Sequence, residues 1–179
     1  VIAADSNLLD GASDVDDVDS SLVISQVEGS TTNVGSAVSV TLSYVDADGV
    51  NQVADVDLTV NANGSYSIAG FDLDALPSGN DATGSFTYTV ADDQGAESGS
   101  ETATITITGT NDAPTLTAGS ISANEDALET GITVIAADSN LLDGASDVDD
   151  VDSSLVISQV EGSTTNVGSA VSVTLSYVD

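Results

Sequence analysis

Apolar and polar residues alternate through most of the chain, which is the period of a β-strand with one buried face. The clearest runs are Val38–Tyr44 and Val53–Val60, in which Val, Leu and Tyr alternate with Ser, Thr and Asp. The segment between them, Asp46-Ala47-Asp48-Gly49, has the composition of a tight turn. The pattern therefore predicts an antiparallel hairpin, with Asp46 and Asp48 as turn residues.

Shorter runs of the same kind lie on both sides of this hairpin. Further strands are expected at residues 22–28, 66–68, 86–90, 103–107, 114–122 and 131–137, with a crossover at residues 71–83. Asn63-Gly64 marks a second hairpin turn. Roughly seven or eight short strands, with turn signals about every 8–12 residues, predict an all-β fold, an antiparallel β-sandwich. Its aliphatic core is expected to surround Tyr44, Tyr66, Phe86 and Tyr88.

The sequence also repeats itself. Val1 to Asp46 recurs unchanged as Val134 to Asp179, so the repeat period is 133 residues. Repeats of solenoid proteins are about 20–50 residues long, whereas this period has the size of a whole domain. We expect the chain to be about one and a third units of a longer array.

The repeat allows more than one division into domains. We expect residues 1–112 to form one repeat that lacks its opening strand, and residues 113–179 to form the first part of the next, identical repeat. Residues 47–179 could instead form one permuted repeat. Alternatively, neighbouring chains could complete one another head to tail, a contact that extends into filaments. The alternation pattern leaves these three arrangements open.

The net charge of the chain indicates that this β-protein needs a bound cation. The 179 residues include 30 Asp and Glu but no Lys, Arg or His, which gives a formal net charge of −30. Many of these charges must lie within a Debye length of ~8–10 Å, so their repulsion opposes a compact state. Calcium is the expected partner because it prefers oxygen ligands. The same charge argues against nucleic acid or an anionic membrane as a direct partner.

Composition also narrows the function classes. The absence of His, Cys and Lys excludes nucleophilic triads and Schiff-base chemistry. A glycosidase with two carboxylates would need aromatic sugar platforms, and four Tyr and two Phe are mostly required by the core. The sequence therefore predicts a protein that is not an enzyme. Without cysteine there is no disulfide, and a bound metal is the usual alternative staple.

The densest group of candidate ligands is an acidic loop that occurs in both copies of the repeat. Its members are Asp14, Asp16, Asp17 and Asp19 in the first copy, and Asp147, Asp149, Asp150 and Asp152 in the second. Four carboxylates within six residues repel one another, which favours a bound calcium ion. The loop is not an EF-hand, because Ser25 occupies the twelfth position, where Glu is required. The simpler interpretation is a solvated acidic loop.

Two segments at the end of the repeat, residues 86–95 (FTYTVADDQG) and 102–114 (TATITITGTNDAP), resemble the VCBS-type cadherin-like repeat. The Asn-Glu-Asp segment at 124–126, the Asp-rich loop at 14–19 and the Asn-Gly turn at 63–64 follow in the order of that family. Such repeats form long arrays in giant secreted bacterial adhesins of the RTX group. The resemblance implies an Ig-like sandwich, calcium at the joints between domains, and a stalk role.

The resemblance also implies where a joint lies. Asn111 and Asp112 resemble the Asn and Asp residues of cadherin linkers. In an Ig-like sandwich the loop between the second and third strands lies at the N-terminal end of the domain. Asp147 and Asp149 are therefore expected to share an ion with Asn111 and Asp112. The alternative is that Asn-Asp-Ala-Pro is a plain turn.

Two further acidic pairs complete the candidate ligands. Glu125 and Asp126 resemble the acidic pair near the opening strand of cadherin-like domains. Asp92 and Asp93 lie on the final hairpin, which is expected at the same end as the acidic loop.

Together these features predict a structural extender module of a secreted bacterial surface adhesin, located outside the cell. Its expected partners are calcium, adjacent repeats of the same chain, and other copies in head-to-tail contact, with no nucleic acid and no direct membrane contact. Two alternatives are a calcium-dependent module that binds glycan or protein, and a filament-forming subunit. Identical tandem copies favour a spacing role over recognition.

Overall fold

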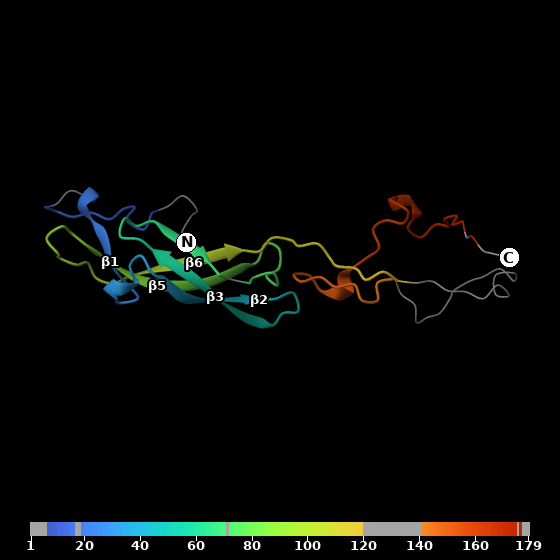
Figure 1. Cartoon of the computed structure of the whole chain (residues 1–179), viewed down its shortest axis with the longest axis horizontal. Coiled ribbons are helices and arrows are strands. Elements are labelled where there is room, and N and C mark those ends of the chain that lie inside the picture. Colours follow the sequence, from blue (N-terminus) through green and yellow to red (C-terminus); the bar gives the residue numbers. More distant parts are fainter. Residues whose placement is uncertain (1–6, 17–18, 71, 120–140, 175, 177–179) are drawn as a thin grey trace. The chain divides into compact units, whose positions relative to one another are not determined.

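The computed structural model describes residues 7–16, 19–70, 72–119, 141–174 and 176 (Figure 1). These residues belong to two units, Val1–Asp112 with Val148–Asp150, and Ala113–Asp147 with Val151–Asp179. In the described part of the chain, no helix has the length and hydropathy that crossing a bilayer would require.

The first unit contains one sheet of six antiparallel strands. The strands are β1 (Val23–Val27), β2 (Ala37–Val45), β3 (Asn51–Val60), β4 (Tyr66–Ala69), β5 (Asp81–Ala91) and β6 (Glu101–Thr108). Their order is β1-β5-β2-β3-β4, and β6 pairs with β5 (Figure 1). The described residues contain no α-helix. The prediction of an all-β, antiparallel fold is confirmed, and the sheet is consistent with a β-sandwich.

The β2–β3 hairpin forms where the alternation predicts it. Val40 lies opposite Val56 and both are buried, because alternate residues of each strand point to the same face. At the turn, the backbone N–H of Gly49 donates to the carbonyl of Asp46 at 3.0 Å. The Asp46 carboxylate accepts from the backbone N–H of Val50 at 2.8 Å. Asp46 is therefore a turn residue, as expected.

The expected crossover at residues 71–83 is wrong at its end, because β5 begins at Asp81. Ala82 and Gly84 occupy the face that continues to Phe86, but they are too small to give an apolar signal. Gly84 is required there: a Cβ would lie 2.6 Å from the Thr41 carbonyl oxygen and 2.6 Å from a methyl group of Leu42. The close approach of β2 thus requires glycine at position 84, and this glycine is one reason why the alternation pattern misses the start of β5.

The core of the first unit is aliphatic around one phenylalanine. Phe86 is 1% exposed, and Tyr44, Tyr66 and Tyr88 are partly buried against the core. This outcome matches the expectation for all four aromatic residues. The other large side chains of the core are Ile24, Val27, Val40, Leu42, Val56, Leu58, Val60, Leu76 and Ile105.

Among its described residues, the second unit repeats the local structure of the first but not its strands. The 3₁₀ turns Asp19–Ser21 and Thr31–Asn33 recur as Asp152–Ser154 and Thr164–Asn166. Residues 155–159, identical in sequence to residues 22–26, form no strand.

The opening strand expected at residues 114–122 is also largely missing from the described residues. Over residues 114–119 only Thr115 pairs, forming an isolated bridge with Ser146 through N–H···O bonds of 2.8 and 3.0 Å. A single bridge leaves the rest of this segment without a sheet partner that would hold it extended. Residues 120–122 and the strand expected at 131–137, with its first copy at 1–4, lie outside the described residues.

Candidate metal centre

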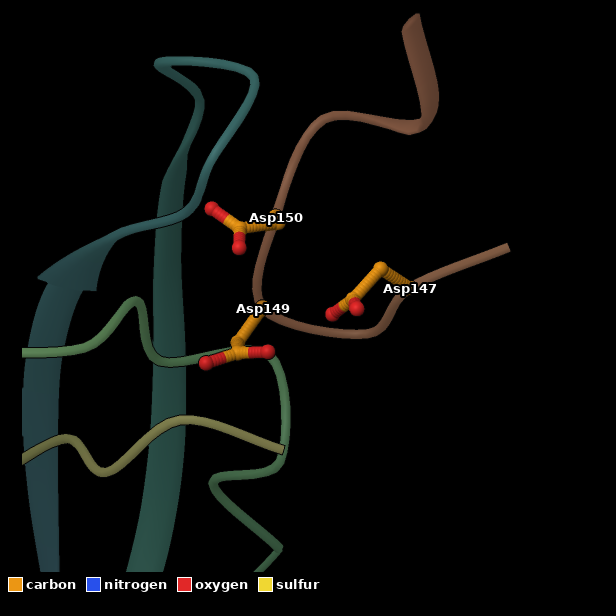
Figure 2. A group of neighbouring side chains, drawn as sticks. All are labelled: Asp147, Asp149 and Asp150. Atoms are coloured by element: carbon orange, nitrogen blue, oxygen red, sulfur yellow. The ribbon is translucent and has the colours of Figure 1, made fainter. Parts of the chain in front are cut away.

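Three carboxylates converge in the acidic loop of the second copy. One oxygen from each of Asp147, Asp149 and Asp150 lies within 4.8 Å of the others. Figure 2 shows that all three side chains come from one short stretch of the loop. Asp152 supports this stretch, because its carboxylate accepts the backbone N–H of Asp147 at 2.9 Å.

The central carboxylate of this triad is buried. Asp149 is 1% exposed, whereas Asp147 is half-buried and Asp150 is exposed. The backbone N–H of Asp112 donates to the two oxygens of Asp149 at 3.3 and 3.4 Å. A buried carboxylate is stable when hydrogen bonds and an opposite charge compensate for its lost hydration. No Lys, Arg or His exists in this chain to supply that charge.

The loop of the first copy has the same internal geometry but a different environment. The backbone N–H of Asp14 donates to the Asp19 carboxylate at 3.3 Å, which repeats the bond between Asp147 and Asp152. Asp16, the counterpart of Asp149, is nevertheless exposed. The burial of Asp149 is therefore caused by its surroundings and not by the sequence of its loop.

Another group of acids lies in the first unit, beside the final hairpin. A hydrogen bond with the Asp14 carboxyl, and then the charge of Asp14, raise the pKa of Asp16, with a smaller contribution from Asp92. Asp14 and Asp92 line the same groove of about 520 Å³. The structure thus brings the final hairpin and the acidic loop together, as the sequence led us to expect.

The acids of the final hairpin also have local roles. One oxygen of Asp92 accepts the backbone N–H groups of Gln94 and Ala96, both at 2.8 Å. Asp93 accepts the side-chain amide of Gln94 at 3.0 Å. These bonds close the turn, and Asp92 also lines the groove.

The remaining candidate ligands that the structure describes contribute no carboxylate to the group formed by Asp147, Asp149 and Asp150. Asn111 is exposed, and its side-chain amide donates to the carbonyl of Asp112. Asp112 contributes its backbone N–H to the triad through Asp149. Asp17, Glu125 and Asp126 lie outside the described residues.

Sequence reasoning missed the other acids of the groove. Asp10, Glu97 and Glu101 also line it. Ala91 forms a bridge with Glu97, and Tyr88 pairs with Glu101 across the last hairpin. Counting pairs outward from the turn at Asp92 would have placed both glutamates beside the loop.

Comparison with known proteins assigns the chain to no family. No family model matches the chain, and no curated protein or solved structure matches it significantly. The likeness to VCBS-type repeats consequently rests on residues 86–114 and on the acidic positions, and it remains an expectation.

The chemistry of the triad points to a hard cation. Carboxylate oxygens suit calcium, which takes about six to eight oxygen ligands in a flexible geometry. Three carboxylates supply up to six oxygens if each binds through both of its own. Backbone carbonyls or water would supply the rest, so the triad has the donor atoms that a calcium site needs.

Proposed function

We propose that this chain is an extender module of a secreted bacterial surface adhesin, built from Ig-like repeats whose joints are stiffened by calcium. The observation that carries the proposal is the buried carboxylate of Asp149 beside Asp147 and Asp150, in a chain without a single cationic side chain. Three clustered carboxylates of which one is buried repel one another strongly, because the low local dielectric weakens screening. A divalent cation removes that repulsion.

A comparison of the two identical acidic loops, residues 14–19 and 147–152, supports a site that involves consecutive repeats. Asp149 is buried and accepts the backbone N–H of Asp112, which closes the motif at the end of a repeat, while Asp16 is exposed. The acidic loop therefore reaches its buried state where the end of a preceding repeat is present. This supports a site that assembles when one repeat follows another.

The proposed mechanism is linkage between ion binding and stability. Free calcium at about a hundredfold over the dissociation constant of a site stabilises the bound state by ~2.7 kcal/mol. Extracellular sites of this type have dissociation constants on the order of 10⁻⁴–10⁻³ M. The sites would consequently be empty in a low-calcium cytoplasm and filled outside the cell, so the stalk stiffens after export.

Thermal unfolding and small-angle scattering with and without calcium test the proposal. With about 10 mM calcium, we expect the Tm to rise by roughly 10 °C and the maximum dimension to become better defined. Asp149→Asn should remove most of this rise. Asp48→Asn, which deletes the same charge in an exposed turn, should keep it. An unchanged Tm and scattering profile after addition of a chelator would refute the calcium-stiffened stalk.

A further inference from the structure

Asn63 and Gly64 form the only Asn-Gly pair in the sequence. Asparagine is a chemically labile residue, and a following glycine makes it more so. The reason is that glycine has no side chain to hinder its own backbone nitrogen, which attacks the asparagine amide. Asn63 is exposed, so water reaches its amide. The pair is therefore a candidate site of spontaneous modification.

Two backbone hydrogen bonds close the turn that contains this pair. The N–H of Gly64 donates to the carbonyl of Asn61 at 2.9 Å, and the N–H of Asn61 donates to the carbonyl of Ser65 at 2.8 Å. Gly64 has a φ of 77°, as the last position of a three-residue hairpin loop requires. The Asn63 side-chain oxygen accepts from the backbone N–H of Ser65 at 3.1 Å and from its hydroxyl at 2.7 Å. In the closed turn the amide is thus held toward Ser65.

The segment Asn7-Leu8-Leu9 docks on the same turn. The side-chain amide of Asn7 donates to the carbonyl of Asn63 at 2.9 Å, and the backbone N–H of Leu8 donates to the carbonyl of Gly64 at 3.0 Å. The side-chain oxygen of Asn7 accepts the backbone N–H of Leu9 at 2.9 Å. Gly64 is buried against this segment, since a Cβ there would overlap the Asn7 side chain and lie 2.9 Å from a carbon of Leu9.

Docking therefore fixes the peptide group that would have to react. Both polar groups of the Asn63–Gly64 peptide are bonded, the carbonyl to Asn7 and the N–H to Asn61. Succinimide formation needs this peptide to rotate, so that the Gly64 nitrogen reaches Cγ of Asn63. Rotation breaks both hydrogen bonds at once. The reaction must then proceed from a locally opened turn, in the way that hydrogen exchange of protected amides does.

We propose that Asn63 is a site of spontaneous deamidation that is gated by the docking of Asn7. In the open turn the Gly64 nitrogen bonds to Cγ of Asn63, the bond from Cγ to the amide nitrogen breaks, and ammonia leaves with the proton of the Gly64 N–H. Water then opens the succinimide at either carbonyl and gives aspartate or isoaspartate. Isoaspartate lengthens the backbone of the turn, so Asn7 no longer fits on it. The reaction needs no calcium and is separate from the proposed stalk function.

Mass spectrometry of the full chain, incubated in mildly alkaline buffer with chelator, measures this reaction. The chain has no Lys or Arg for trypsin to recognise, so chymotrypsin is used to release the peptide from Thr59 to Tyr66. Replacement of the Asn63 amide by a carboxyl group raises the mass of this peptide, and fragmentation distinguishes aspartate from isoaspartate. Parallel samples are kept folded and unfolded in urea, and the unfolded sample gives the rate without a gate.

The gate predicts a definite order of rates. Asn63 should deamidate at least about tenfold faster in the unfolded chain than in the folded one. Asn7→Ala removes two hydrogen bonds of the docked segment, and it should accelerate the folded chain about fivefold. Asn33→Ala is the matched control, because the Asn33 side chain also donates to a backbone carbonyl, that of Val27 at 3.0 Å, in another turn. It should leave the rate at Asn63 unchanged.

Three results would overturn the proposal. They are an intact Asn63 in the unfolded chain, equal rates in the folded and unfolded chains, and equal rates for Asn7→Ala and Asn33→Ala. The last result would assign the reaction to unfolding of the whole unit instead of the turn. Urea midpoints from circular dichroism show whether each variant is folded at the start. The comparison of folded with unfolded chain needs no substitution, so it decides the matter even if Asn7→Ala does not fold.

Discussion

At the scale of single residues, hydrogen bonds decide which acids stabilise the fold. Asp46 accepts the side-chain amide of Gln52 at 2.7 Å and the backbone N–H of Val50 at 2.8 Å. These bonds favour the ionised carboxylate, so they lower the pKa of Asp46, with the bond from Gln52 contributing most. Asp16 shows the opposite effect, because the neighbouring Asp14 raises its pKa.

The lowered pKa of Asp46 predicts a specific pH dependence. A carboxyl group whose pKa is lower in the folded state stabilises the fold above its unfolded pKa, close to 3.8. That contribution is lost as the pH falls through the folded pKa. Asp46→Asn should therefore lower the urea midpoint at pH 7, and the two midpoints should converge as the pH falls below the folded pKa of Asp46. A constant difference between the midpoints at both pH values would contradict this role.

At Gly84, β5 passes close to β2. A Cβ at this position meets the carbonyl oxygen of Thr41 at 2.6 Å, and a backbone atom in a sheet moves only at a cost. We expect Gly84→Ala to destabilise the first unit by about 1–3 kcal/mol, as overpacking does elsewhere. Gly99→Ala is the control, because no atom lies within 4 Å of its Cβ position. Urea denaturation followed by circular dichroism measures both, and equal stabilities would disprove the steric argument.

The acidic residues also show where sequence reasoning ends. The alternation of charges and turns places Asp14 and Asp147 in equivalent loops, and the structure gives both loops the same hydrogen bond to Asp19 and Asp152. The sequence pattern does not distinguish Asp149 from Asp16, because their local sequences are identical. Burial of one and exposure of the other arise from contacts with residues distant in the sequence, such as Asp112.

At the scale of elements, the repeated segment separates local from long-range causes of structure. Glu28 and Gly29 form a two-residue turn with positive φ values of 51° and 68°, closed by bonds between Val27 and Ser30. Glu161 and Gly162 form the same turn with values of 49° and 69°. Turn chemistry is thus encoded locally, as the type I′ geometry of such loops requires.

Strands, in contrast, form only where a partner is present. Val23–Val27 is a strand because β5 pairs with it, but the identical residues 156–160 form no strand. The alternation pattern therefore predicts which residues are able to pair, and it located five of the six strands closely. Whether they pair depends on residues elsewhere, and β5 was placed five residues late because Ala82 and Gly84 give no apolar signal.

A matched pair of valines tests this difference between the copies. Val40→Ala removes two methyl groups from a site that is 5% exposed, which should destabilise the first unit by about 2 kcal/mol. Val173→Ala makes the same change at a site that is 70% exposed, and its effect should be within about 0.5 kcal/mol. Both are measured by urea denaturation at the same low protein concentration. Equal effects would mean that the second copy is also packed.

At the scale of the whole molecule, one sign of charge dominates. With a net charge of −30, every folded arrangement brings like charges together, and only solvent ions compensate for them. Apolar residues make up 40% of the chain, and the burial of their side chains opposes this charge repulsion and favours the compact state. Stability should therefore depend on ionic strength even where no specific ion is bound.

Salt in the presence of a chelator isolates this general effect. Raising sodium chloride from about 0.01 M to about 1 M shortens the Debye length from ~30 Å to ~3 Å, which screens the repulsion. We expect the Tm of the first unit to rise steadily over this range without calcium. Sodium sulfate at matched ionic strength serves as a check on the nature of the anion. A Tm that stays constant, or falls, would show that charge repulsion does not limit stability.

The turn at Glu28-Gly29 has a consequence for the time course of folding. The turn closes from neighbouring residues, but the β1 residue Ser25 meets Thr89 across 64 residues of sequence. At a synthesis rate of about 5–20 residues per second, the partner strand appears roughly 3–13 s after the turn. During that delay the turn has formed in the nascent chain, but the apolar residues of β1 have no partner strand. The slow step in forming the first unit is then the wait for β5, the strand that pairs with β1.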